Sequence, residues 1–322
     1  MHSISKTPLT AEIAQTLITA QFGTACRVRC FEELKEGMFN TAALLELEDG
    51  LKCVLKIAPP EGVRVLRYER DIMKAEVGAM RLVRAQTGVP TPKIYGCDTS
   101  RSLIGSEYFI MEFLPGTPFH KLRASFSPAE QTAIDQSVGR ITCEIASITG
   151  SSFGLYSQPE LPGVPWRVSI EHLLRGILLD GQEMEVAFPI SYDGIFQQLE
   201  IHFAALDEVT TPSLVHWDLW DGNIFVDPLT KQITGLIDFE RALWGDPLME
   251  VIFGPFNPID PFIQGYGAKL LETPNQRTRR ALYNAYLYLI MVIECYYRQY
   301  TNKDQENWAR GMLDGELKKL RG

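Results

Sequence analysis

His-Trp-Asp-Leu-Trp-Asp-Gly-Asn at residues 216–223 is the most informative stretch of the chain, and a short apolar run, Leu-Ile-Asp-Phe at 236–239, follows it. The first segment has the form H-x-D-x-x-x-x-N, and the second delivers a single aspartate. One carboxylate can receive the proton of an attacking hydroxyl, while an asparagine and a second aspartate can hold magnesium. The two segments together predict phosphoryl transfer from a nucleotide.

Asp218 is the candidate catalytic base. On its own, an aspartate here would be interpreted as a turn residue before a helix. Asn223 lies five residues further on and Asp238 ends an apolar strand, which favours the catalytic role, and these two residues are the candidate Mg²⁺ ligands. The ring of His216 is expected to bond backbone and brace the loop. Trp217 and the second tryptophan of the motif are expected to pack the loop, with stacking on a substrate as the alternative.

Lys56 is the candidate phosphate-binding residue, because it lies in the otherwise apolar strand Val-Leu-Lys-Ile at 54–57. An isolated lysine there could equally point outward by alternation. Glu76, on the predicted following helix, is the preferred partner, since a Lys–Glu pair fixes the α and β phosphates in kinase-like enzymes. Glu69 and Glu36 are the competing partners.

Two further segments are expected to bind the nucleotide. The loop at 36–41 lies between the first two predicted strands, where Gly37, Phe39 and Asn40 could contact phosphate. It contains one glycine, so its position supports this role more than its composition does. An apolar strand runs into a Pro/Gly-rich linker, and its backbone is expected to bond an adenine edge through Met111, Glu112, Phe113 and Leu114.

The element pattern predicts an α+β fold with two lobes. A helix at 7–21 precedes strands at 27–31, 40–47 and 51–57, a helix at 66–86, and strands at 94–97 and 107–113. The linker Leu-Pro-Gly-Thr-Pro at 114–118 marks the boundary, so the lobes are residues 1–114, for the nucleotide, and 115–322, for catalysis and substrate. The second lobe is predicted to be helical, at 127–148, 168–181, 192–207, 264–271, 275–300 and 304–319.

Charge and composition narrow the partners. The 322 residues carry a net charge of −9. Residues 1–114 hold 14 acidic and 14 basic side chains, while residues 115–322 hold 26 and 17. This distribution argues against nucleic acid. It is compatible with a cationic acceptor, although an acidic surface that serves solubility is the commoner explanation.

The remaining composition indicates a cytoplasmic enzyme without a membrane anchor. Six scattered cysteines form no C-x-x-C pair, which favours reduced thiols over disulfides or zinc. The longest apolar stretch, at 281–297, is interrupted by Asn284 and Glu294 and is short for a bilayer span. The sequence leaves a monomer and a homodimer equally open.

These motifs resemble the aminoglycoside phosphotransferase and choline kinase-like superfamily. The shared features are Lys56, Glu76, the segment 111–116, the motif at 216–223, Ile-Asp-Phe-Glu at 237–240 and Trp-Gly-Asp-Pro at 244–247. The resemblance implies a bilobal protein-kinase-like fold and ATP- or GTP-dependent phosphorylation of a small-molecule hydroxyl with Mg²⁺. It implies the roles given above for the named residues, and a structural role for Asp246.

The chain departs from the family pattern in ways that leave the substrate open. Many members carry His-Gly-Asp-Leu-His-x-Gly-Asn, whereas this chain has tryptophan at 217 and 220, a form similar to fructosamine kinase-like members too. Three hypotheses remain: an antibiotic phosphotransferase, a metabolic kinase of an amino alcohol, amino sugar, thioribose or glycated amine, and a catalytically silent nucleotide-binding module. Glu240, Arg241 and Glu294 are the candidate acceptor-side groups.

Overall fold

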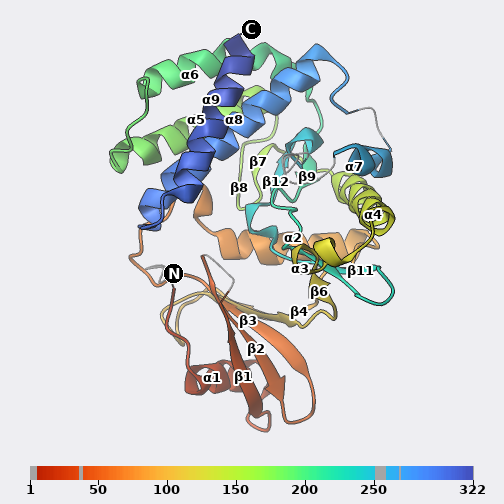
Figure 1. The fold of residues 1–322 in the computed structure, drawn as a ribbon. Coiled ribbons are helices and arrows are strands. Elements are labelled where there is room, and N and C mark those ends of the chain that lie inside the picture. Colours follow the sequence, from red (N-terminus) through yellow and green to blue (C-terminus); the bar gives the residue numbers. More distant parts are fainter. Residues whose placement is uncertain (1–5, 36–38, 251–258, 268–269, 322) are drawn as a thin grey trace.

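The computed structural model describes residues 6–35, 39–250, 259–267 and 270–321, and Figure 1 shows a small sheet region below a larger helical region. The predicted phosphate-loop residues Gly37 and Glu36 lie outside the described residues. Among the described residues, no helix is long and apolar enough to cross a bilayer. The interrupted stretch at 281–297 is instead part of a buried helix, α8 (Pro274–Tyr297).

The sheet region is one antiparallel sheet of five strands in the order β1-β2-β3-β5-β4. Its strands are β1 (Val28–Leu34), β2 (Thr41–Leu47), β3 (Lys52–Ile57), β4 (Ile94–Asp98) and β5 (Tyr108–Glu112). A tight turn joins β2 to β3, where Gly50 takes φ 88° and the Asp49 carboxylate accepts a bond from the Leu51 N–H at 2.9 Å. Alternate residues of β2 are buried, as expected of a strand with one face on a core.

Helix α1 (Ala11–Phe22) covers one face of this sheet. Thr10 caps it by accepting a bond from the Ile13 N–H at 3.3 Å. Leu17 and Ile18 are fully buried in a cluster with the β2 and β3 side chains. The helix thereby shields the sheet face that turns away from the catalytic segments.

Helix α2 (Ile72–Gln86) packs on the other face and contacts the short turn at 239–241. Val77, Met80 and Val83 bury their side chains against β5. The helix begins later than the predicted residue 66, because Asp71 takes the left-handed conformation with φ 57°. A separate 3-10 turn at 67–69 precedes it, and this break separates Glu69 from Glu76.

The linker after β5 leads into a second, small sheet. Its strands are β6 (Thr117–Pro118), β10 (Ile224–Val226) and β11 (Ile233–Leu236), in the order β11-β10-β6. Gly116 takes φ 109°, and a Cβ there would lie 2.5 Å from the Thr234 hydroxyl oxygen. Because the five-stranded sheet ends at Glu112 while β6 pairs with β10, we propose the lobe boundary at residues 114/115.

The helical region is built around α8. Its other helices are α3 (Phe119–Leu122), α4 (Pro128–Ala146), α5 (Trp166–Glu183), α6 (Tyr192–Glu200), α7 (Ile259–Tyr266) and α9 (Asp304–Arg321). A third sheet, in the order β8-β7-β12-β9, combines β7 (Gly154–Leu155), β8 (Gln158–Pro159), β9 (Ser213–Val215) and β12 (Leu243–Gly245). It holds the start of the 216–223 motif against the helices.

Two helix predictions in this region were wrong in extent. The helix expected at 264–271 is α7, which ends at Tyr266 because Gly267 takes φ 76° and its N–H bonds the Ile263 carbonyl at 3.1 Å. The helix expected at 192–207 is divided into α6 and a 3-10 turn at 203–208.

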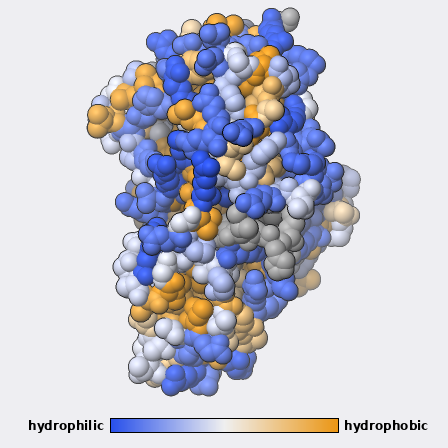
Figure 2. Space-filling model, turned by 90° about the vertical axis from the view of Figure 1, so that its left-hand side faces the viewer, coloured by the Kyte–Doolittle hydropathy of each residue, from blue (hydrophilic) through white to orange (hydrophobic). Residues whose placement is uncertain are grey.

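Figure 2 shows a mixture of hydrophilic and hydrophobic groups on one side of the molecule, with hydrophilic residues covering much of the helical part.

Candidate active site

A cavity of about 1420 Å³ lies between the sheet region and the helical region. Its walls come from β1 to β3, the segment 111–118, the motif at 216–223, the turn at 237–241, α8 and α9. The described candidate site residues that line it are Phe39, Asn40, Lys56, Glu76, Met111, Glu112, Phe113, Leu114, Asp218, Asn223 and Asp238. The structure therefore brings together residues that are up to 199 positions apart in the chain.

His216 holds the catalytic loop from the inside, as the sequence predicted. Its Nε2–H donates to the Ile237 carbonyl at 2.9 Å, and its Nδ1 accepts the Asp218 N–H at 3.2 Å. Burial lowers the pKa of His216 to about 4. A neutral ring with its proton on Nε2 satisfies both bonds and ties the 216–223 loop to the segment that carries Asp238.

A buried carboxylate that the sequence analysis missed also positions this loop. Glu250 accepts bonds from the N–H groups of His216 at 2.7 Å and Trp217 at 2.9 Å. Trp217 needs such support, because it takes the left-handed conformation with φ 59°. Its indole stacks on Tyr286 of α8 with ring centroids 5.3 Å apart, so packing is its role. No spacing rule distinguishes Glu250 from other glutamates in the sequence.

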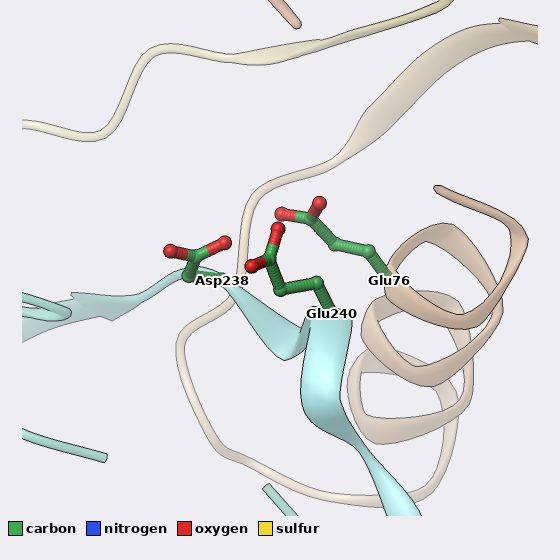
Figure 3. A group of neighbouring side chains, drawn as sticks. All are labelled: Glu76, Asp238 and Glu240. Atoms are coloured by element: carbon green, nitrogen blue, oxygen red, sulfur yellow. The ribbon is translucent and has the colours of Figure 1, made fainter. Parts of the chain in front are cut away.

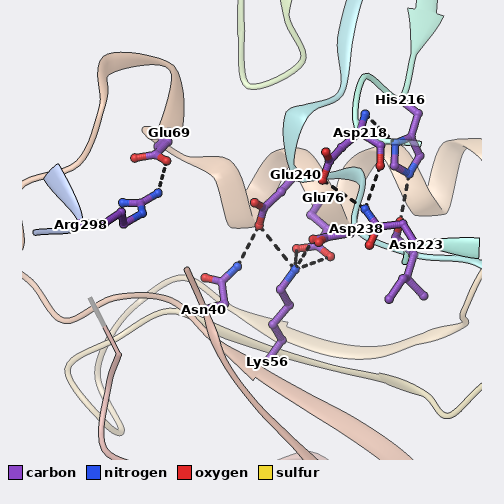
Figure 4. A network of polar contacts seen from close by, with 11 residues as sticks. Asn40, Lys56, Glu69, Glu76, His216, Asp218, Asn223, Asp238, Glu240 and Arg298 are labelled. Atoms are coloured by element: carbon purple, nitrogen blue, oxygen red, sulfur yellow. Dashed lines mark hydrogen bonds and ion pairs between the residues drawn. The ribbon is translucent and has the colours of Figure 1, made fainter. Parts of the chain in front are cut away.

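Asp218 and Asn223 face each other across the loop (Figure 4). The Asn223 side-chain amide donates to the Asp218 carboxylate at 3.1 Å and to the Asp218 carbonyl at 2.8 Å. Burial raises the pKa of Asp218, and the nearby Asp238 carboxylate adds to this, whereas Arg241 opposes it. The bond from Asn223 fixes the orientation of the Asp218 carboxylate toward the cavity.

Lys56 lies at the centre of an acidic group. Its ammonium donates to both Glu76 carboxylate oxygens, at 2.8 and 2.7 Å, and to Asp238 Oδ1 at 2.6 Å. Glu240 is 3.5 Å away. Burial alone would lower the pKa of Lys56, but Asp238 and its two acidic neighbours raise it well above its ordinary value. Lys56 is therefore charged in this arrangement.

Lys56 pairs with Glu76 and not with Glu69. Glu69, the main competing partner, instead forms an ion pair with Arg298 and accepts the Leu66 N–H at 2.9 Å. The difference follows from the break at Asp71, which places the two glutamates on separate elements. The preference for Glu76 that the sequence supported agrees with this pair.

Glu76, Asp238 and Glu240 point toward one another, and their oxygens lie within 4.8 Å (Figure 3). This cluster already encloses the Lys56 ammonium, which supplies the positive charge there. Asn223 and Asp238 stay the predicted magnesium ligands. Lys56 engages Oδ1 of Asp238, and Asp218 engages only the amide nitrogen of Asn223. Oδ2 of Asp238 and Oδ1 of Asn223 accept no hydrogen bond from the described residues, and Mg²⁺ prefers oxygen ligands.

The segment 111–114 forms the end of the cavity beside the sheet. The Glu112 N–H bonds the Lys93 carbonyl at 2.8 Å, and the Phe113 N–H bonds the Lys52 carbonyl at 3.4 Å. Among the described residues, the Leu114 N–H has no such partner. Met111 lines the cavity from β5. A backbone donor beside an apolar side chain suits the edge and face of a nucleobase.

The candidate acceptor-side residues divide into two groups. Glu240 accepts a bond from the Asn40 side chain at 3.0 Å and approaches Lys56, so it lies among the candidate nucleotide residues. Arg241 lies 3.7 Å from Glu294 of α8. The Phe39 ring packs under the Arg298 guanidinium at 4.3 Å, which gives Phe39 a packing contact as well as its place in the wall.

The contacts of Asp246 and Trp220 bear on two other structural expectations. The Asp246 carboxylate accepts bonds from Arg279 and Tyr283 of α8, each at 2.8 Å, and from the Leu248 N–H at 3.0 Å. Its role is structural, as the resemblance implied. Trp220 stacks on His120 at 5.4 Å and is partly exposed at the cavity wall.

Comparison with known proteins establishes the family. The family model described as the phosphotransferase enzyme family matches residues 31–282, which is most of the chain. The protein belongs to this family of phosphotransferase enzymes. The α+β architecture expected from the sequence, with an antiparallel sheet followed by a larger helical part, is confirmed.

Individual relatives are distant. The chain is 23% identical over 222 residues to the probable acyl-CoA dehydrogenase IBR3 of Arabidopsis thaliana, a match that covers 67% of this chain and 26% of that protein. It is 24% identical over 218 residues to a probable ketoamine kinase of Vibrio parahaemolyticus, covering 66% and 71%. The chain thus spans about a quarter of the length of the plant relative.

A solved structure with the same fold is aminoglycoside phosphotransferase APH(4)-Ia in a ternary complex with AMP-PNP and hygromycin B. The TM-score is 0.68 at 20% identity, and the match covers 96% of this chain and 99% of that one. At this identity the likeness concerns the fold. The compounds named in that complex are properties of that protein.

Proposed function

We propose that the protein transfers the γ-phosphoryl group of ATP or GTP to a hydroxyl of a small molecule. One observation carries the proposal: Lys56, Asp218, Asn223 and Asp238 line a single cavity, although they come from β3 and from two loops far along the chain. The membership of the phosphotransferase family supports the reaction class.

The nucleotide would lie between β3 and the segment 111–114. The base would meet the Leu114 N–H and Met111, while the Lys56 ammonium would contact the α and β phosphates. Glu76 would hold Lys56 in place by the bonds already described. Asn40 would approach the phosphates once it leaves Glu240, to which it is bonded in this structure.

Asp218 would serve as the base. The acceptor hydroxyl gives its proton to the Asp218 carboxylate as its oxygen bonds to the γ-phosphorus. The bond from that phosphorus to the β–γ bridging oxygen breaks, and the nucleoside diphosphate leaves with the electron pair. Asn223 and Asp238 would hold Mg²⁺, which neutralises charge on the phosphate oxygens.

Release of nucleoside diphosphate tests the proposal. The wild type and Asp218→Ala are incubated with Mg²⁺ and ATP or GTP against a panel of hydroxyl compounds, and phosphorylated products are identified by mass. We expect a product with the wild type and none above background with the variant. Tight nucleotide binding without any product would instead favour the silent regulatory module.

The names of the relatives leave the acceptor open. Ketoamines and an aminoglycoside occur among them, but at 20–24% identity neither assigns a substrate here. A resistance role would require that the chain protects a sensitive host from an antibiotic.

The described structure shows all six cysteines as free thiols, which supports our prediction of a cytoplasmic location. A monomer and a homodimer remain equal predictions.

A further inference from the structure

We infer that the acceptor is an uncharged or singly anionic hydroxyl compound with an apolar segment, and that polycations are excluded. This inference rests on the proposed kinase function. It concerns the acceptor pocket, the part of the cavity beyond Arg241 that α8, α9 and the connection between them enclose. Its apolar lining residues are Leu287, Tyr288, Met291, Tyr300 and Trp308.

The apolar wall is continuous with the catalytic residues. Positions 287, 291 and 294 share one face of α8, because residues four and three apart lie above one another on a helix. Met291 and Trp308 are only partly buried, so a ligand can cover them. The Trp308 ring meets Tyr288 edge to face at 5.6 Å. Asp218 lines the same cavity, so an acceptor resting on this wall can present its hydroxyl to it.

The two glutamate carboxylates of the acceptor pocket are already paired within the protein. The Glu69 carboxylate is bound by Arg298. The Glu294 carboxylate accepts a bond from Gln305 at 2.7 Å and lies 3.7 Å from Arg241. Each glutamate described there has an arginine beside it, so an entering ammonium group would gain no free carboxylate and would meet two guanidinium groups.

Glu240, Glu32 and Glu33 of the cavity wall do not provide a second cation site. Glu240 is engaged by Lys56 and Asn40. Glu32 and Glu33 stand on β1 at the rim and are exposed, where water and salt screen them. The acidic excess of residues 115–322 therefore does not converge on the acceptor pocket. An alcohol with an apolar body, with or without one anionic group, matches both the wall and the arginines.

Turnover and binding test the inference together. In the presence of Mg²⁺ and ATP, 3-phenylpropan-1-ol is compared with 3-aminopropan-1-ol and hygromycin B as acceptors. Binding is followed with the amphipathic anionic dye 1-anilinonaphthalene-8-sulfonate in the presence of Mg²⁺ and AMP-PNP. We expect the phenyl alcohol to be the better acceptor or, where none of these surrogates turns over, to displace the dye when the two amines do not.

A substitution tests whether the dye binds in the acceptor pocket. Met291→Glu should weaken dye binding about tenfold, because it puts a charge into the apolar wall. Leu229→Glu is the matched control, since Leu229 is 88% exposed in a distant turn. Met291→Gln replaces the glutamate variant if thermal unfolding shows that the latter misfolds.

Two results would overturn the inference. One is a phenyl alcohol that is neither the better acceptor nor able to displace the dye, which includes preferred phosphorylation or binding of either amine. The other is dye affinity that is absent in the wild type or unchanged by the Met291 substitution. Failure of the proposed kinase function is separable, because it would appear as a wild type that phosphorylates no compound of the hydroxyl panel, whether or not it binds Mg²⁺–AMP-PNP, whereas the dye measurements report on the pocket without turnover.

Discussion

Lys56 shows how single residues set the chemistry of the cavity (Figure 4). Its ammonium is held by Glu76 and Asp238 and is approached by Glu240. A triphosphate that approaches this ammonium also meets the three carboxylates around it, and magnesium would offset their repulsion. The arrangement therefore agrees with a metal-bound nucleotide as the ligand.

Replacement of this lysine is the first prediction. Lys56→Met should lower kcat/KM for ATP at least about hundredfold, because it removes the phosphate contact and leaves buried carboxylates without their cation. Steady-state kinetics with varied ATP measure the effect. Lys318→Met, at an exposed ion pair on α9, should behave as the wild type. An unchanged KM and kcat in the Lys56 variant would contradict the proposed nucleotide position.

Asp218 allows chemistry to be separated from binding. Asp218→Asn keeps the shape of the side chain but removes the proton acceptor, so kcat should fall about 10²- to 10⁴-fold. Affinity for Mg²⁺–AMP-PNP, measured by calorimetry, should change by less than about threefold. Full activity in this variant would exclude Asp218 as the base.

The raised pKa of Glu250 predicts that the stability of the fold depends on pH. Burial raises the pKa of Glu250 to about 7, above its ordinary value of 4.5. The folded state then binds more protons than the unfolded state between these values, so Glu250 lowers the free energy of unfolding as pH rises from about 4.5 to about 7. Glu250→Gln should remove up to about 3 kcal/mol of this decline. Urea unfolding at pH 5 and pH 8 measures it, and equal declines in both proteins would refute it.

At the scale of elements, the catalytic loop is tied to α4 by one guanidinium. Arg123, in the turn after α3, forms ion pairs with Asp221 of the loop and Asp135 of α4. Asp135 is buried and Arg123 is mostly so. An arginine fork that meets two carboxylates fixes their separation as well as their charge. The loop is thus supported from α4 as well as from His216 and Glu250.

Loss of this tie should be costly. Arg123→Met should lower the free energy of unfolding by about 3 kcal/mol, because two partly or fully buried carboxylates lose their shared cation. Arg167→Met breaks a half-exposed pair with Asp207 and should cost less than about 1 kcal/mol. Both are measured by urea unfolding at pH 7. Equal effects of the two substitutions would mean that the Arg123 network does not support the loop.

At the scale of the whole molecule, the cavity joins the two regions of the protein. Lys56 comes from the sheet, while Asp218, Asn223 and Asp238 come from the helical side. A ligand that contacts both sets stabilises their association, because it binds the folded state alone. The nucleotide and its metal should therefore act on global stability.

Thermal unfolding tests this linkage. Mg²⁺–AMP-PNP at about 100 times its dissociation constant should stabilise the protein by about 2.7 kcal/mol, seen as a higher melting temperature. EDTA should reverse most of the increase if the metal carries the phosphates. Asp238→Asn should reduce the increase in the same way. A melting temperature that does not change when the metal is removed would argue against Asn223 and Asp238 as Mg²⁺ ligands.

Local patterns in the sequence determined the strands, the β2–β3 turn, the long helix α8 and the loop that carries Asp218 and Asn223. These follow from alternation, turn residues and helical periodicity, which act over a few neighbouring positions. The predicted start of α2 and the predicted end of α7 were wrong, because left-handed residues at Asp71 and Gly267 interrupt a helical pattern that otherwise continues. Such backbone conformations leave little trace in periodicity.

Tertiary structure alone decided which distant groups meet. The pairing of Glu69 with Arg298, the support of the loop by Glu250, and the face of α8 that closes the acceptor pocket depend on packing between elements. The physical reason is that ion pairs and cavity walls form across space, whereas the sequence records spacing along the chain.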